Sequence, residues 1–76
     1  MEGRIPQDRS LVTVNGETRS VQAGNIGELL EELGFGSPRG GIAVALNGRV
    51  VARGRWNEQR VATGDRVEVV GAVQGG

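Results

Sequence analysis

Two Asn-Gly dipeptides, Asn15-Gly16 and Asn47-Gly48, constrain the fold of this chain more than any other feature. Each stands between two β-prone runs. A type I′ turn needs positive φ at both central residues, so Asn-Gly between such runs is typical of a two-residue β-hairpin. Alternation places Val12 and Val14 on one face of the first strand. The four predicted strands are residues 11–14, 18–21, 42–46 and 49–53.

One helix is predicted between the two hairpins. Asn25 can cap its N-terminus with Glu28 three residues later, as in a capping box. Gly34 suits the positive φ that often ends a helix, whereas Gly27 disfavours the first turn by about 1 kcal/mol relative to Ala. The apolar residues at helical spacing form one stripe, Ile26, Leu29, Leu30 and Leu33. The acidic residues, interpreted as the solvated face and not as a metal site, are Glu28, Glu31 and Glu32.

A fifth strand is predicted from Arg66 to Val70, after a tight turn at 63–65, and residues 54–62 read as irregular. The predicted order is β-β-α-β-β-β, with one apolar helix face to bury. The simplest solution is a two-layer α+β fold, a β-grasp or ubiquitin-like arrangement with the first and last strands central and parallel. We expect an N-terminal extension at 1–9, a domain at 10–70 and a flexible tail at 71–76.

Composition excludes several classes of function. The chain has 76 residues and contains neither Cys nor His, which removes thiol nucleophiles, the commonest general base and the usual metal ligands. Its net charge of zero argues against binding nucleic acid. No apolar run is long enough to span a membrane, and residues 1–9 lack the apolar core of a signal peptide. We expect a cytoplasmic protein that is monomeric when free, binds no metal or cofactor and is not itself an enzyme.

The last residues, Gly75-Gly76, carry the main functional signal. We expect Gly76 to bear a carboxylate that another protein's active site can approach from any direction, because no side chain surrounds it. Gly75 would let a partner close tightly on the backbone. The preceding residues, Gly71, Ala72, Val73 and Gln74, include no bulky group and follow directly on the last strand.

Several segments make the chain resemble the ThiS family of bacterial sulfur carriers, over about residues 11–76. The resemblance rests on residues 14–17 at the first turn, 26–30 in the helix, 44–51 at the second hairpin and 64–70 in the last strand. The ending at 71–76 is its most specific part. The extension before Ser10 departs from the compact members of the family.

The resemblance implies a function for the terminus. A ThiF-like activating enzyme would adenylate Gly76 with ATP and Mg²⁺. A persulfide on a cysteine desulfurase or another sulfur donor would convert the adenylate to a thiocarboxylate. Thiazole synthase (ThiG) would then take the sulfur for the thiazole of thiamine. Residues 71–75 would contact these partners along the way.

Other readings remain open at this level. The small subunit of molybdopterin synthase shares the fold and the Gly-Gly end, and carriers for tRNA thiolation or cysteine synthesis are similar. The chain could also be a non-covalent β-grasp interaction module, or a covalent protein tag. Trp56 is interpreted as a cover over one end of the core, with an exposed partner contact as the alternative. The same choice, solvated face or docking patch for an acidic surface, applies to Arg49, Arg53, Arg55, Arg60 and Arg66.

Overall fold

The computed structural model describes residues 9–35 and 41–71 of the chain. These residues form five strands and one α-helix in the predicted order, and a short 3₁₀ helix that was not predicted precedes the last strand. The α+β class is therefore confirmed. The elements are β1 Ser10–Val14, β2 Glu17–Val21, α1 Ile26–Glu32, β3 Ile42–Leu46, β4 Arg49–Val51, η1 Arg53–Arg55 and β5 Arg66–Gly71.

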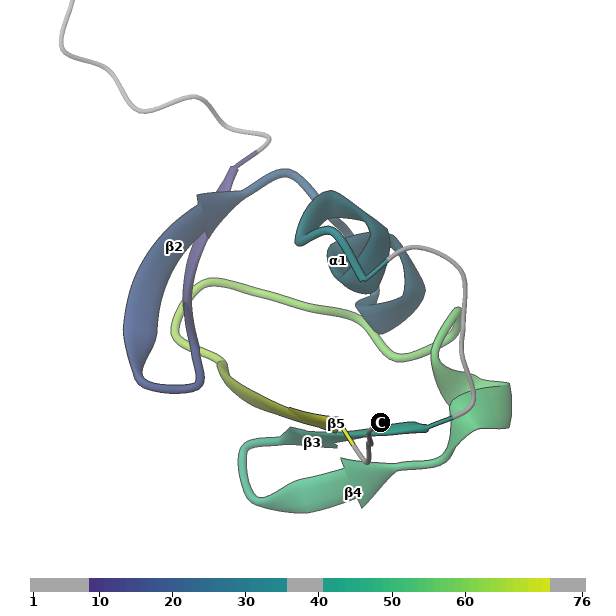
Figure 1. Ribbon diagram of the computed structural model, residues 1–76. Helices are drawn as coiled ribbons and strands as arrows, with labels where there is room; N and C mark the ends of the chain where they lie inside the picture. The colour runs from purple at the N-terminus through teal and green to yellow at the C-terminus, as the bar shows by residue number, and fades with distance from the viewer. Residues whose placement is uncertain (1–8, 36–40, 72–76) are drawn as a thin grey trace, which may run out of the picture.

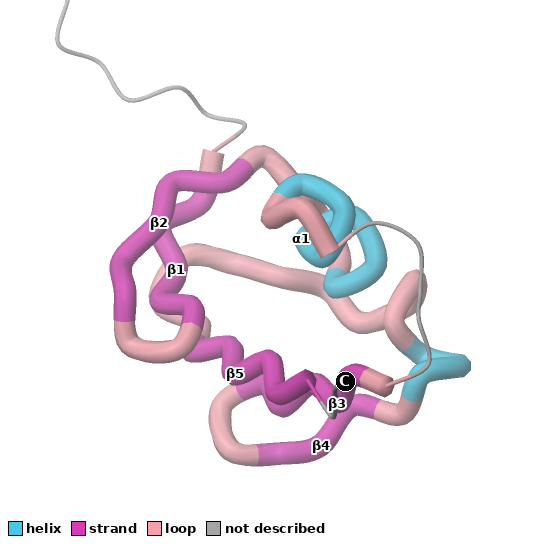
Figure 2. Tube along the Cα trace, viewed as in Figure 1, coloured by secondary structure: helices cyan, strands magenta, loops and turns pink. Residues whose placement is uncertain are grey.

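The strands form one mixed sheet in the order β2-β1-β5-β3-β4. The first and last strands, β1 and β5, are neighbours and run parallel, whereas the other neighbouring pairs are antiparallel. Helix α1 lies across one face of this sheet (Figure 1), and the path of the chain through the two hairpins is clear in Figure 2. This arrangement is the predicted β-grasp, with β5 in the middle of the sheet.

Both Asn-Gly dipeptides form the expected turns. Asn15 and Gly16 have φ of 51° and 88°, and Asn47 and Gly48 have φ of 52° and 86°. Positive φ at both central residues gives the backbone a twist that matches the flanking strands. The two turns therefore fix the registers Val14↔Glu17 and Leu46↔Arg49.

Helix α1 is capped at both ends by local interactions. The Asn25 side chain accepts from the Glu28 backbone N–H at 2.8 Å, and the Glu28 carboxylate accepts from the Gly24 N–H at 2.9 Å. In a standard capping box the Glu28 carboxylate would accept from the N–H of Asn25 itself. Here it accepts from the N–H of the preceding residue, Gly24. At the C-terminus Gly34 has φ of 93°, and the Phe35 N–H donates to the Leu30 carbonyl at 2.9 Å, as in a Schellman motif.

Replacement of the capping residue tests this account of the helix start. We expect Asn25→Ala to lower the free energy of unfolding by about 1 kcal/mol, because the Glu28 N–H loses its acceptor. Urea unfolding would measure the difference. Asn25→Asp is the matched control, because its carboxylate oxygen can still accept from the Glu28 N–H. Equal effects of the two substitutions would contradict the capping role.

The core lies between α1 and the sheet and is entirely aliphatic apart from Trp56. The apolar stripe of the helix is buried at Ile26, Leu29 and Leu30, and Leu33 packs against the core partly buried. Alternate strand residues complete the core, as the sequence pattern predicts. They are Val12, Val14, Val21, Val44, Leu46, Val67 and Val69, joined by Ala23 and Val61 from loops.

The strand predicted at 49–53 is shorter in the structure. Strand β4 ends at Val51, and the chain turns at once into the 3₁₀ helix η1. The indole N–H of Trp56 donates to the Val51 carbonyl at 3.0 Å, and the Arg55 N–H donates to the Ala52 carbonyl at 2.8 Å. These bonds turn the chain back over the core, which ends the strand early.

The segment after η1, read from sequence as irregular, is held against the start of α1. The first N–H groups of a helix have no partner within the helix. Here the Ile26 N–H donates to the Gln59 carbonyl and the Gly27 N–H to the Trp56 carbonyl, both at 3.0 Å. A Cβ on Gly27 would meet the Asn57 side-chain amide, so a larger residue at this position would require that side chain to move.

No helix in residues 9–35 and 41–71 has the length and apolar character needed to cross a membrane.

Candidate functional site

The candidate site begins where β5 leads into the C-terminal residues. Gly71, predicted as the first residue of the tail, belongs to β5 instead, because it lies opposite Ile42 of β3 in the antiparallel register. The domain boundary predicted at residue 70 therefore moves by one residue. The other predicted site residues, Ala72, Val73, Gln74, Gly75 and Gly76, lie outside the described part of the chain.

Two asparagine side chains hold β5 from its two sides. The Asn15 side chain accepts from the Val69 N–H at 2.9 Å and donates to the Val69 carbonyl at 3.2 Å. The Asn47 side chain accepts from the Arg66 N–H at 2.8 Å and donates to the Asp65 carboxylate at 3.0 Å. Sequence reasoning assigned these residues to turns only. Their second role connects residues far apart in the sequence, and no local pattern signals it.

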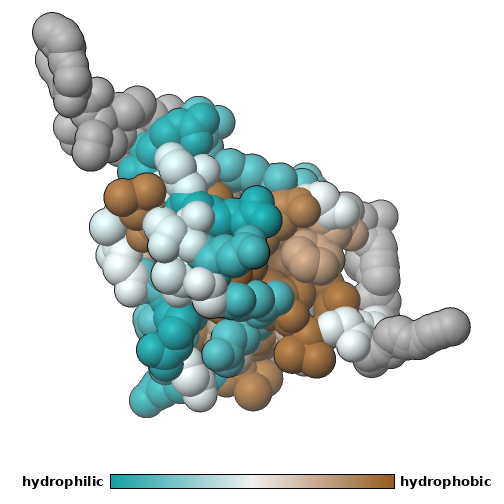
Figure 3. Space-filling model, turned by 60° about the vertical axis from the view of Figure 1, so that its left-hand side comes forward, coloured by the Kyte–Doolittle hydropathy of each residue, from teal (hydrophilic) through white to brown (hydrophobic). Residues whose placement is uncertain are grey.

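The sheet face opposite α1 carries an apolar patch beside the end of β5. Val70 and Val50 are 62% and 81% exposed. Val70 lies opposite Ala43, and Ala45 lies opposite both Val50 and Glu68. We call Ala43, Ala45, Val50 and Val70 the outer apolar patch. Figure 3 shows hydrophobic residues gathered over part of one face of the molecule, beside a hydrophilic part.

Trp56 covers one end of the core and is only 9% exposed. Its ring packs with the Arg53 guanidinium 5.6 Å from the centroid, a cation–π distance. Together with the indole bond to Val51, this confirms the core-cover interpretation. The alternative, an exposed contact for a partner, is wrong for this side chain.

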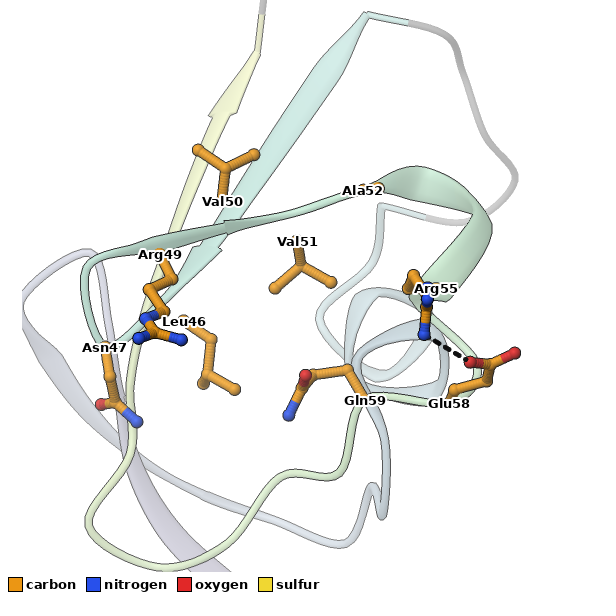
Figure 4. Close-up of a pocket in the computed structure, with 9 residues that line it drawn as sticks. All are labelled: Leu46, Asn47, Arg49, Val50, Val51, Ala52, Arg55, Glu58 and Gln59. Carbon is orange, nitrogen blue, oxygen red and sulfur yellow. Dashed lines mark hydrogen bonds and ion pairs between the residues drawn. The ribbon is translucent and has the colours of Figure 1, made fainter.

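The arginines considered for a docking patch are all exposed, namely Arg49, Arg53, Arg55, Arg60 and Arg66. Arg49 and Arg55 line an open pocket of about 630 Å³ beneath β4, together with Gln59 and with Glu58, which pairs with Arg55 at 3.3 Å (Figure 4). Leu46 and Val51 point into this pocket, whereas Val50 points to the other side of β4. Its rim therefore mixes both signs of charge over an apolar floor.

The acidic residues of α1 are exposed, as expected, but two of them have structural partners. Glu28 accepts from the Gly24 N–H, and Glu32 accepts from the N–H groups of Gln22 and Ala23 at 2.9–3.1 Å. Glu32 thereby fixes the connection between β2 and the helix, a role that the sequence pattern did not indicate. Among the described residues, no group of three or more potential ligands is placed to hold a metal ion.

The chain matches the model of the ThiS family over residues 10–76. Its structure is similar to the crystal structure of the thiamine biosynthesis protein ThiS from Geobacter metallireducens, with a TM-score of 0.71 and 33% sequence identity. That match covers 87% of this chain and 99% of the other. None of the curated proteins compared with the chain matches it. With the β-grasp sheet and the family match extending through the Gly-Gly end, the chain belongs to the ThiS family of ubiquitin-like sulfur carriers.

Proposed function

We propose that this protein carries sulfur for thiazole formation in thiamine biosynthesis, as a thiocarboxylate on the C-terminal carboxylate of Gly76. The observation that carries the proposal is the family match, which extends from the first strand through residue 76. The protein then acts as a co-substrate of its partner enzymes and does not itself catalyse a reaction. ATP and Mg²⁺ belong to the activating enzyme.

The position of β5 supports this function. The strand lies in the middle of the sheet, paired with β1 at Arg66 and Val67 and with β3 from Val67 to Gly71, so the residues that follow Gly71 continue from a strand anchored within the sheet. Five residues remain from 72 to 76, and an extended chain of that length reaches roughly 17 Å at ~3.3–3.6 Å per residue. That reach allows the terminus to enter a partner's active site while the folded body stays outside.

The chemistry requires activation because a carboxylate is ionised at neutral pH and is a poor electrophile. In the proposed reaction a Gly76 carboxylate oxygen attacks the α-phosphorus of ATP, and pyrophosphate leaves. A persulfide sulfur on the donor then attacks the acyl carbon and displaces AMP. A thiol cleaves the resulting acyl disulfide, which releases the thiocarboxylate and forms a disulfide with the donor's cysteine. Thiazole synthase would be the acceptor of that sulfur.

The outer apolar patch is the surface that we propose for docking the body on a ThiF-like activating enzyme. It adjoins Gly71, and exposed apolar residues clustered on one face are typical of protein contacts. We expect Val70→Asp to weaken binding about tenfold, which corresponds to about 1.4 kcal/mol, because an unpaired charge would enter the interface. Titration calorimetry with the activating enzyme would measure it.

Leu11→Asp is the matched control for that substitution. Leu11 is 47% exposed on the same face, but it lies at the other end of the sheet, where its carbonyl accepts from the Gly64 N–H. We expect the affinity of the Leu11→Asp variant for the activating enzyme to stay within about twofold of that of the unmodified chain, a difference of about 0.4 kcal/mol. Equal losses for both variants would place the docking surface elsewhere.

The decisive experiment is the intact mass of the purified chain before and after incubation with its activating enzyme, ATP, Mg²⁺ and a persulfide source. We expect a mass increase equal to the replacement of one oxygen by one sulfur. Addition of thiazole synthase and its substrates should then return the mass to its starting value. An unchanged mass with a competent activating enzyme would overturn the carrier function and favour the non-covalent interaction module.

A further inference from the structure

The sheet is narrowest at the point where β5 leads toward the terminus. At Val67, β5 is flanked by Val14 of β1 and by Leu46 of β3. At Gly71 the only paired neighbour among the described residues is Ile42 of β3. Strand β1 has already ended at Val14, and β4 pairs with β3 only from Leu46 to Val44. Among the described residues, the last rungs of the sheet are thus a two-stranded ribbon.

Asn15 stands at the root of that ribbon. The Asn15 backbone N–H donates to the Val67 carbonyl at 2.9 Å, which is the last backbone bond from the β1 side. Backbone groups that face one neighbour recur at every second residue of a strand, so Val69 is the next β5 residue facing this side. There the Asn15 side-chain amide supplies the acceptor and the donor that two residues of a longer β1 would otherwise have supplied.

We propose that Asn15 is a positioning residue for the reaction at Gly76: its side chain continues β1 and fixes the direction in which β5 leaves the sheet. The proposal rests on the carrier function proposed above. Two-stranded ribbons twist more strongly and more variably than strands inside a sheet. Without the Asn15 amide the ribbon would begin two residues earlier, at Val67, and a change in twist there would alter the direction in which the chain leaves the sheet at Gly71.

The chain provides a matched comparison in its second Asn-Gly turn. Asn47 has nearly the same φ as Asn15 and binds one β5 amide, that of Arg66, but it does so at the opposite end of the strand. Asn15→Gly and Asn47→Gly each remove one side-chain amide and keep a residue that tolerates positive φ. Both variants should therefore lose similar stability, while only Asn15→Gly should affect the end of β5.

The structural test is amide hydrogen exchange and the residual dipolar coupling of the Gly71 N–H, measured by NMR on the full chain. In Asn15→Gly we expect the Val69 amide to exchange at least about tenfold faster and the Gly71 coupling to change. In Asn47→Gly the Arg66 amide should exchange faster instead, with the Gly71 coupling unchanged. An unchanged Gly71 coupling in Asn15→Gly, with the fold retained, would overturn the positioning role.

The functional test is adenylation by the activating enzyme, with kcat and KM for the carrier measured separately. We expect Asn15→Gly to lower kcat by about tenfold with little change in KM, because the body still docks while the carboxylate is misplaced. Asn47→Gly should keep kcat. Equal kcat values for the two variants would overturn the proposal. If the unmodified chain is not adenylated, the proposed carrier function is wrong. The Gly71 coupling would then still show whether the Asn15 side chain fixes the direction of β5.

Asn15→Asp covers the case in which Asn15→Gly does not fold. It tolerates the positive φ and keeps an oxygen that accepts from the Val69 N–H, but it loses the donor to the Val69 carbonyl. We expect the Val69 amide to stay protected and kcat to fall less than in Asn15→Gly. A kcat equal to that of the unmodified chain, with a shifted Gly71 coupling, would contradict the link between this position and the reaction.

Discussion

A chain that lacks Gly76 is expected to bind the activating enzyme but to form no thiocarboxylate. The body and the outer apolar patch are unchanged by this deletion, so the affinity should stay within about twofold, or about 0.4 kcal/mol. The new terminal carboxylate, on Gly75, would lie about 3.3–3.6 Å short of the reactive position, and misplacement of a reacting group by even 1 Å can cost about a hundredfold in rate. Intact mass after incubation with ATP and a persulfide source measures the outcome.

Thr18→Ala is the control for that deletion. Thr18 is an exposed residue of the edge strand β2, and its substitution leaves the whole C-terminal segment intact. We expect this variant to gain sulfur like the unmodified chain. Two results would contradict the division between a docking body and a reactive terminus. One is sulfur transfer by the chain that lacks Gly76, and the other is loss of binding to the activating enzyme when Gly76 is deleted.

Leu29→Ala is expected to bring the protein close to unfolding. Leu29 is fully buried between α1 and the sheet, and its truncation should cost about 2–5 kcal/mol because the cavity cannot collapse fully. A 76-residue domain at ~0.05–0.15 kcal/mol per residue has only about 4–11 kcal/mol of stability. We expect Tm to fall by about 10 °C or more, measured by circular dichroism.

Leu11→Ala removes the same atoms from a leucine that is 47% exposed. Surface substitutions of this kind usually change stability by less than about 0.5 kcal/mol, so Tm should move by only a few degrees. A comparable loss of stability in both variants would show that the helix stripe is not the main source of the buried area.

The elements set by neighbouring residues could be predicted from the sequence. The two hairpins follow from Asn-Gly, because Asn and Gly reach positive φ at little cost and the φ values of Asn15 and Asn47 agree. The helix start at Asn25 and its end at Gly34 follow from caps that act within four residues. The two-layer architecture then follows from the need to bury one apolar helix face, and the observed strand order is the one that the β-grasp arrangement implies.

The candidate site could be predicted only in part. The sequence points to Gly76 through the Gly-Gly end and the ThiS-like segments, and those residues stay a prediction because they lie outside the described residues. The sequence did not indicate that Gly71 belongs to β5. Its place depends on pairing with Ile42 of β3, a residue far away in the sequence.

What the sequence determined by itself was the set of strands and the helix with its caps, because each depends on dihedral preferences or on neighbouring residues. Only the tertiary structure decided that Asn15 and Asn47 hold β5, that Trp56 ends β4 at Val51 and that Glu32 anchors the chain after β2. Each of these is a hydrogen bond whose partner is chosen by how the elements pack. A local pattern carries no information about that choice, since the same side chain would serve equally well as a simple turn, loop or surface residue.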